Sequence, residues 1–112
     1  MARILAFDTT AELGSIAYFD GLELAELAMH SPEGFGHILF DRVAALLDRV
    51  GVAVGDIDCF ASANGPGSFT GVRIGLTAAK GLAEASGRPM VAVSNLRALA
   101  SFGSAALRAT VL

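Results

Sequence analysis

The sequence has 112 residues, which is enough for one small domain. Its net charge is −3 and its basic residues are scattered, which argues against a large nucleic-acid footprint. Apolar residues make up 54% of the chain, and the mean hydropathy is +0.59. Because so short a chain has a limited interior, we expect part of this apolar surface to face a partner or a further part of the protein.

The N-terminus and the cysteine content bear on where the protein works. Asp8 interrupts the first apolar run too early for a signal peptide, and no apolar stretch is long enough to cross a bilayer. Cys59 is the only cysteine, so no internal disulfide can form, which fits a reducing compartment. The sequence therefore predicts a soluble, cytoplasmic protein with no membrane partner.

The first half of the chain predicts three antiparallel strands, over 3–7, 14–19 and 22–29. Asp20-Gly21 between the last two is typical of a hairpin with a type I′ turn, which needs positive φ.

Residues 31–34 break the pattern, and a helix is predicted over 35–50, closed by Gly51. Its apolar arc spans roughly 140°, wider than the ~100° stripe that one core contact requires. Phe40 and Leu47 lie on the flank of this arc and are candidates for a second surface.

The second half predicts helices that alternate with strands. A strand is expected over 56–63, a helix over 68–86 that stops at Gly87, and a strand over 88–93. Ser94 is expected to cap a third helix that ends near Gly103, and the last residues, RATVL, read as the start of a further strand.

The resulting order, βββαβαβα, predicts an α/β fold with a mixed sheet of about five strands and helices on its faces. A ribonuclease-H-like or actin-like lobe has this order, with the first and fourth strands adjacent and parallel. Asp8 and the Gly-Pro loop at 64–67 would then meet at one end of the sheet, where open α/β sheets place ligand clefts.

The Gly-Pro loop lacks the Lys-Ser/Thr of a Walker A loop, and its glycines are spaced one residue too far apart for the dinucleotide fingerprint. Two alternatives remain: an anion held on free helix N–H groups, or a tight turn in which Ser68 caps the helix. We favour the second. The residues that would form a nucleotide or phosphate site are Asp8, Thr9, Thr10, Gly65, Gly67 and Ser68. Asp8 can instead simply satisfy backbone donors of its own turn, which is the interpretation we favour.

The helix over 68–86 has small residues on one side, Gly71, Gly75 and Ala78 among them. Each interior glycine costs about 1 kcal/mol relative to alanine, and small residues four apart let another backbone approach closely. That backbone could belong to the chain's own sheet or to a foreign helix, and the sequence leaves both open.

His30, His37 and Cys59 do not have the spacing of a metal-ligand set, and no nucleophile–base grouping can be assembled. We therefore expect no catalytic residues, no metal and no cofactor.

Three segments, ILAFDTT, GPGSFTGVRIGLTAAKGLA and PMVAVSNLRALA, resemble the TsaB (YeaZ) family of the bacterial tRNA threonylcarbamoyladenosine pathway. The resemblance covers nearly all of the chain. It implies an actin-like (ASKHA) fold of two lobes, in which residues 1–112 are the single N-terminal lobe and RATVL leads towards the second. An older name for the family is peptidase M22 or glycoprotease, and no nucleophile–base pair in this sequence supports a peptidase activity.

The resemblance also implies a function. TsaB proteins are non-catalytic partners of the catalytic subunit TsaD; with TsaE, the complex transfers a threonylcarbamoyl group to adenosine 37 of tRNA. TsaD carries an H-x-x-x-H metal pair where this chain has Asn95 and Leu99. Leu99 cannot ligate a metal, and Asn95 is a poor transition-metal ligand. The chain would thus meet tRNA only indirectly. The alternative is an actin-like nucleotide-binding or phosphotransfer enzyme.

In the family, two helices form the surface used for docking TsaD or, without TsaD, for self-association as a homodimer. Carried over, this surface falls on 37–50 and 70–85. The residues expected there are Phe40, Val43, Leu47, Val50, Gly71, Val72, Gly75, Leu76, Ala78, Ala79 and Leu82. On this interpretation Gly71 and Gly75 are small because helices of two chains meet there.

Overall fold

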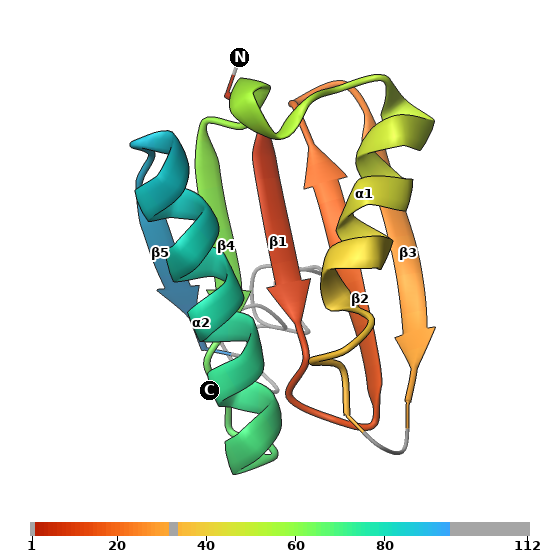
Figure 1. Ribbon diagram of the computed structural model, residues 1–112, viewed down its shortest axis with the longest axis vertical. Helices are drawn as coiled ribbons and strands as arrows, with labels where there is room; N and C mark the ends of the chain where they lie inside the picture. The colour runs from red at the N-terminus through yellow and green to blue at the C-terminus, as the bar shows by residue number, and fades with distance from the viewer. Residues whose placement is uncertain (1, 32–33, 95–112) are drawn as a thin grey trace, which may run out of the picture.

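The computed structural model describes residues 2–31 and 34–94 (Figure 1). Its strands are β1 (Ile4–Asp8), β2 (Leu13–Phe19), β3 (Leu24–His30), β4 (Cys59–Ala63) and β5 (Met90–Val93). Its helices are α1 (Leu39–Val50) and α2 (Phe69–Ser86), with a short 3₁₀ turn, η1 (Val54–Asp56), before β4. The predicted order of elements is confirmed through β5; the third helix, expected to follow Ser94, and RATVL lie outside the described residues.

The strands form one mixed sheet in the order β3-β2-β1-β4-β5. β1 pairs antiparallel with β2 and parallel with β4, and β4 pairs parallel with β5. The predicted α/β fold, with its first and fourth strands side by side, is therefore confirmed. This topology places the C-terminal ends of β1, β4 and β5 at the same end of the sheet.

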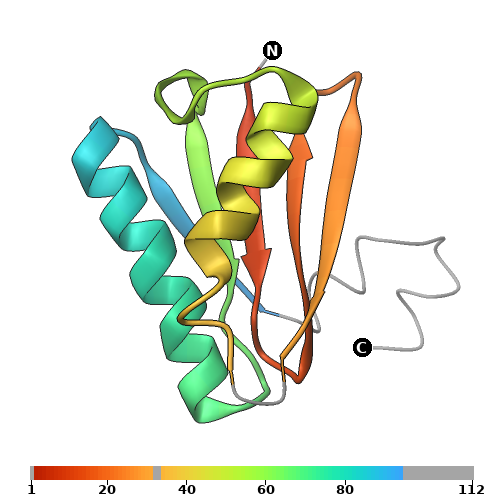
Figure 2. The same ribbon diagram turned by 45° about the vertical axis from the view of Figure 1, so that its right-hand side comes forward.

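Both helices cover the same face of the sheet (Figures 1 and 2). α2 packs on β4, β1 and β5, and α1 packs on β2 and β3. Alternate strand residues such as Leu5, Tyr18 and Phe60 point into this layer, where they are at most 1% exposed. Neither helix is long and apolar enough, in the residues described, to cross a membrane.

The hairpin between β2 and β3 is confirmed, but the predicted type I′ turn is wrong. Phe19 pairs with Leu24, and the backbone N–H of Asp20 donates to the Glu23 carbonyl, so Gly21 and Leu22 are the central residues. Of these only Gly21 has positive φ, at 95°, which is the pattern of a type II′ turn. The Asp20 carboxylate shifts the turn by one residue, because it accepts the N–H groups of Leu22 and Glu23 at 3.0 and 2.7 Å.

Two predicted boundaries are also wrong. The helix predicted from residue 35 begins at Leu39, because Gly34 has a φ of 100° and residues 35–38 form turns in which Phe35 is buried. The strand predicted from residue 56 begins at Cys59. The Asp56 carboxylate accepts the Ala53 N–H at 3.1 Å and closes the η1 turn instead.

Candidate functional site

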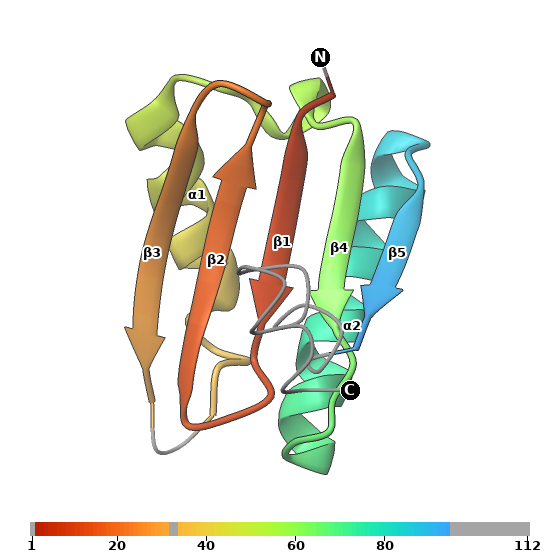
Figure 3. The same ribbon diagram turned by 180° about the vertical axis from the view of Figure 1, so that it is seen from behind.

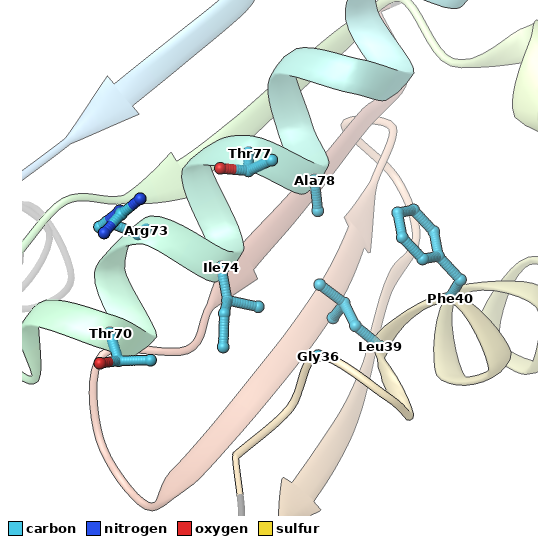
Figure 4. Close-up of a pocket in the computed structure, with 8 residues that line it drawn as sticks. All are labelled: Gly36, Leu39, Phe40, Thr70, Arg73, Ile74, Thr77 and Ala78. Atoms are coloured by element: carbon cyan, nitrogen blue, oxygen red, sulfur yellow. The ribbon is translucent and has the colours of Figure 1, made fainter.

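An apolar groove lies between α1 and α2 on the helical face of the molecule (Figure 4). It has a volume of about 390 Å³ and is lined by Gly36, Leu39, Phe40, Thr70, Arg73, Ile74, Thr77 and Ala78. In Figure 4 the side chains of Leu39 and Phe40 lie across the groove from Ile74 and Ala78. The groove forms because the two helices pack on different strands and leave the seam between them open.

Phe40 is the large apolar side chain of this groove that is exposed to solvent among the described residues. It is 56% exposed, whereas Leu39 beside it is 1% exposed. The prediction that Phe40 lies on a second surface of α1 agrees with this exposure. The companion prediction for Leu47 is wrong, since Leu47 is 3% exposed and belongs to the core under α1.

Arg73 is the one charged residue among those that line the groove. Its guanidinium carbon lies 5.5 Å from the centre of the Phe69 ring, in cation–π range. Phe69 is itself 76% exposed. The N-terminal part of α2 thus presents an aromatic ring and a positive charge beside the apolar groove.

The two glycines that drew attention in the sequence are explained by the chain's own sheet. A Cβ at position 71 would lie 2.0 Å from the Thr9 carbonyl oxygen. A Cβ at position 75 would lie 2.6 Å from Ser62 Oγ and 2.7 Å from Thr9 Oγ1. The interpretation that a foreign helix requires Gly71 and Gly75 is therefore wrong, and the first turns of α2 lie against Thr9, which follows β1, and Ser62 of β4.

Gly81 is the glycine of α2 without such an internal reason. Among residues 2–31 and 34–94, a Cβ there would meet no atom within 4 Å. It follows Thr77 by one helical turn, so it extends the line of Thr70, Ile74 and Thr77 along the groove side of α2. The stretch of α2 that leaves room for a foreign backbone is therefore centred on Thr77 and Gly81.

The other predicted interface residues divide by burial. Val43, Ala78 and Ala79 are buried, whereas Val50, Val72, Leu76 and Leu82 are half-buried. The groove residues Leu39, Thr70, Arg73, Ile74 and Thr77 fall within the predicted ranges 37–50 and 70–85 but are not among the residues expected at the interface, and Gly36 lies outside both ranges. Thr70, Arg73, Thr77 and Gly81 recur at helical spacing, which is the signal that could have identified this side of α2.

The Asp8–Thr10 turn and the Gly-Pro loop do meet at one end of the sheet, as expected. The Ser68 N–H donates to the Thr10 carbonyl at 2.7 Å, and Gly67 packs directly on Thr10. Asp8 Oδ1 accepts the hydroxyl and the N–H of Thr10 at 2.7 and 3.1 Å. Thr9 and Thr10 are 1% and 4% exposed, so these contacts fasten the loop to β1.

The start of α2 is built as the capping alternative describes. The Ser68 hydroxyl accepts the Gly71 N–H at 3.2 Å, and the Thr9 hydroxyl donates to the Gly71 carbonyl at 2.6 Å. Beside it lies a depression that also includes the carboxylate-bearing Glu12. A negative charge at this position opposes the binding of an anion.

Among residues 2–31 and 34–94, no group of three or more His, Cys, Asp or Glu side chains could hold a metal. His30 lies 3.2 Å from the Glu12 carboxylate on the surface, and Cys59 is half-buried. Asn95 and Leu99, at the positions of the TsaD metal pair, lie outside the described residues.

The fold and the helical groove define the class of this protein: an α/β lobe of the actin-like, ribonuclease-H-like type. RuvC of Thermus thermophilus in complex with a Holliday junction substrate shares this fold, with a TM-score of 0.57 over 86% of this chain, 66% of RuvC and 15% identity. YeaZ from Pseudomonas aeruginosa is much more similar, with a TM-score of 0.85 and 39% identity over 91% of this chain and 48% of YeaZ.

The family described as "TsaD: tRNA N6-adenosine threonylcarbamoyltransferase" matches residues 33–110. The chain belongs to this family, and its resemblance to TsaB (YeaZ) proteins is confirmed by curated relatives of that name. It is 42% identical over 99 residues to the Escherichia coli tRNA threonylcarbamoyladenosine biosynthesis protein TsaB, covering 88% of this chain and 42% of the relative. The Bacillus subtilis TsaB protein is 38% identical over 101 residues, 89% of this chain and 44% of the relative. The chain thus spans less than half the length of these relatives.

Proposed function

We propose that this chain is the groove-bearing lobe of a non-catalytic partner subunit in the biosynthesis of threonylcarbamoyladenosine at position 37 of tRNA. Its partner is a TsaD-type catalytic subunit, which docks on the groove between α1 and α2. The similarity to TsaB proteins supports the pathway. The observation that carries the docking surface is the open apolar groove with Phe40 left 56% exposed beside it.

The shape and chemistry of the groove suit a helix. Leu39, Ile74 and Ala78 provide apolar contact area, and helices recognise such grooves through apolar side chains spaced three and four residues apart. Gly81 gives the incoming backbone room to approach α2 closely. Arg73 at one side favours a partner with an acidic residue at the matching position.

The remaining roles follow from this docking. Catalysis resides in the TsaD-type subunit, because Asn95 and Leu99 occupy the positions of its metal-binding histidines. TsaE joins through the complex of the two subunits, and tRNA is met only indirectly. In the absence of the catalytic subunit, a second copy of the chain fills the groove as a homodimer. All of these steps take place in the cytoplasm.

Gly81→Leu tests the docking surface. Because a Cβ at position 81 meets no atom within 4 Å in the part of the chain that the structure describes, the variant should fold normally, yet its side chain occupies the space proposed for the partner helix. In sedimentation velocity with the TsaD-type subunit, the wild-type chain should form a complex and Gly81→Leu should lose it.

Ala45→Leu is the matched control, because Ala45 is exposed on α1 and does not line the groove; it should bind like the wild type. Equal binding by Gly81→Leu would rule the groove out. Gly75→Leu is unsuitable, since its side chain would collide with Ser62 and Thr9 inside the chain.

The alternative of a nucleotide-binding protein rests on the meeting of the Asp8–Thr10 turn with the Gly-Pro loop. It has less support, because Thr9 and Asp8 already bond within the loop region. Calorimetry with ATP and magnesium on the full two-lobed protein decides between the two: a binding isotherm that Asp8→Asn abolishes would favour the nucleotide site, and no heat at millimolar nucleotide would reject it.

A further inference from the structure

β3 is an edge strand of seven residues (Figures 1 and 3). Within the part of the chain that the structure describes, it pairs with β2 alone. An edge strand offers unpaired backbone groups to a strand of another molecule, and proteins protect such edges with bulges, prolines, lysines or covering elements. The sequence of β3, LAELAMH, contains neither proline nor lysine, and its register with β2 runs without a bulge. This edge therefore needs another form of protection.

The hairpin determines which backbone groups of β3 face outward. The N–H of Asp20 donates to the Glu23 carbonyl at 3.2 Å, so these two residues form a hydrogen-bonded pair. In an antiparallel ladder, such pairs alternate with pairs whose backbone groups point away from the partner strand. The residues of β3 that direct their N–H and C=O groups away from β2 are therefore Leu24, Glu26, Ala28 and His30. The side chains of all four are exposed.

A side chain of α1 occupies one of these outward groups. Arg49, in the last turn of α1, donates a hydrogen bond from Nη2 to the Glu26 carbonyl oxygen at 2.8 Å. The charge of the guanidinium strengthens this hydrogen bond. The contact divides the outward edge, leaving Leu24 on one side and Ala28 and His30 on the other. Each stretch is shorter than an ordinary strand pairing.

We infer that Arg49 closes the β3 edge to strand addition by a second copy of this chain. In one antiparallel register all four outward residues of both copies can pair, with Leu24 opposite His30 and Glu26 opposite Ala28. This register keeps the two Glu26 carboxylates from lying directly opposite each other, which would be unfavourable. The guanidinium of Arg49 stands where the N–H of Ala28 of the second copy would donate. This edge includes none of the residues that line the groove between α1 and α2.

Self-association of an Arg49 variant tests the inference. All variants carry Gly81→Leu, so that the groove proposed above as a docking surface does not contribute. In sedimentation velocity, Arg49→Ala should self-associate with a dissociation constant at least tenfold lower than that of the Gly81→Leu parent. Arg42→Ala, which removes another exposed arginine of α1, should behave like the parent. Equal self-association by Arg49→Ala and the parent would overturn the inference.

Ala28→Pro separates strand addition from a simple loss of stability. The N–H of Ala28 faces away from β2, so a proline there removes a donor that only an incoming strand would use. Adding Ala28→Pro to Arg49→Ala should return the self-association to the level of the parent. Undiminished association of this double variant would overturn the inference, because a chain that associates only through lost stability is not rescued by proline.

Amide hydrogen exchange keeps the test decisive if the proline variant fails to fold. In the dilute parent, the amides of Glu26 and Ala28 should exchange at rates close to those of an unfolded peptide, because both face outward. In Arg49→Ala both should slow at least tenfold as the protein concentration rises. Slow exchange of these amides in the dilute parent would mean that the edge is already covered. That result, or exchange in Arg49→Ala that does not respond to concentration, would contradict the inference.

Discussion

At the scale of single residues, the glycines of α2 show that one residue type can serve opposite purposes. Gly71 and Gly75 are required by the close approach of β1 and β4, so their cost in helix propensity is offset inside the chain. No neighbour among the described residues requires Gly81, so no contact among them offsets its cost of about 1 kcal/mol relative to alanine.

Alanine substitutions at the two kinds of position should therefore have opposite effects. Gly71→Ala should lower the free energy of unfolding by about 3 kcal/mol, because the new Cβ meets a backbone carbonyl that cannot move aside. Gly81→Ala should raise it by about 1 kcal/mol. Urea denaturation of both variants measures these values. A stabilised Gly71→Ala would show that α2 does not lie against β1 as described.

Asp20 is the residue that shapes the β2–β3 turn, and its environment predicts a pH dependence. Backbone hydrogen bonds from Glu23 and Leu22 lower the pKa of its carboxyl, and Tyr18 donates a further hydrogen bond at 3.1 Å. Burial and the nearby Asp20 raise the pKa of Tyr18 in turn. Because the folded pKa of Asp20 is depressed, its stabilising effect is complete above the unfolded pKa and is lost as the pH falls through the folded one.

Asp20→Asn removes the ionisable carboxyl. The difference in stability between the wild type and this variant therefore measures the effect of the charge. The wild type should be more stable than the variant at pH 7, and the gap should narrow steadily below about pH 4. Thermal unfolding of both proteins between pH 7 and pH 2.5 provides the comparison. A gap that is constant over this range would mean that the carboxylate charge contributes nothing to the turn.

At the scale of elements, the start of α2 depends on a side-chain cap. The Ser68 hydroxyl accepts the Gly71 N–H, and replacing such a cap by alanine costs about 1 kcal/mol. Ser68→Ala should therefore lower the free energy of unfolding by that amount. Ser68→Asp should keep most of the stability of the wild type, because aspartate caps helices as well as serine does. Chemical denaturation of the two variants tests this, and equal losses in both would assign the helix start to other contacts.

How well the sequence predicts each element depends on whether its signal is local. Ser68 and Gly87 are strong local signals, and α2 begins and ends beside them as predicted. The predicted start of α1 is too early because Phe35 is apolar and continues the helical pattern. Phe35 is buried, but it lies in the turn that precedes the helix. The hairpin turn was misplaced because the Asp20 carboxylate bonds to backbone groups two and three residues ahead.

At the scale of the whole molecule, the order of elements predicted the mixed sheet, the pairing of β1 with β4 and the meeting of Asp8 with the Gly-Pro loop. The groove was predicted only in part, through Phe40. Its opposite wall depends on which side of α2 faces the sheet, and the small residues at 71 and 75 are compatible with either a sheet or a partner. The small residues face the sheet because Gly71 packs against the backbone of Thr9, which is 62 residues away in the chain.

The sheet and the groove between the helices have different roles. The sheet and its buried side chains hold α1 and α2 at a fixed separation, and the groove between them remains apolar and accessible. The central claim is that a partner helix occupies this groove and covers Phe40. A few residues buried at the centre of an interface provide most of its binding energy, and aromatic residues, Phe included, are enriched at interfaces.

The affinity of the Phe40→Ala variant for the TsaD-type subunit tests this claim most directly. Measured by isothermal titration calorimetry against the wild type, the variant should bind at least tenfold more weakly, a loss of about 1.4 kcal/mol or more. Its fold should be unchanged, because Phe40 is 56% exposed in the chain alone. An affinity within twofold of the wild type would contradict the assignment of the groove as the docking surface.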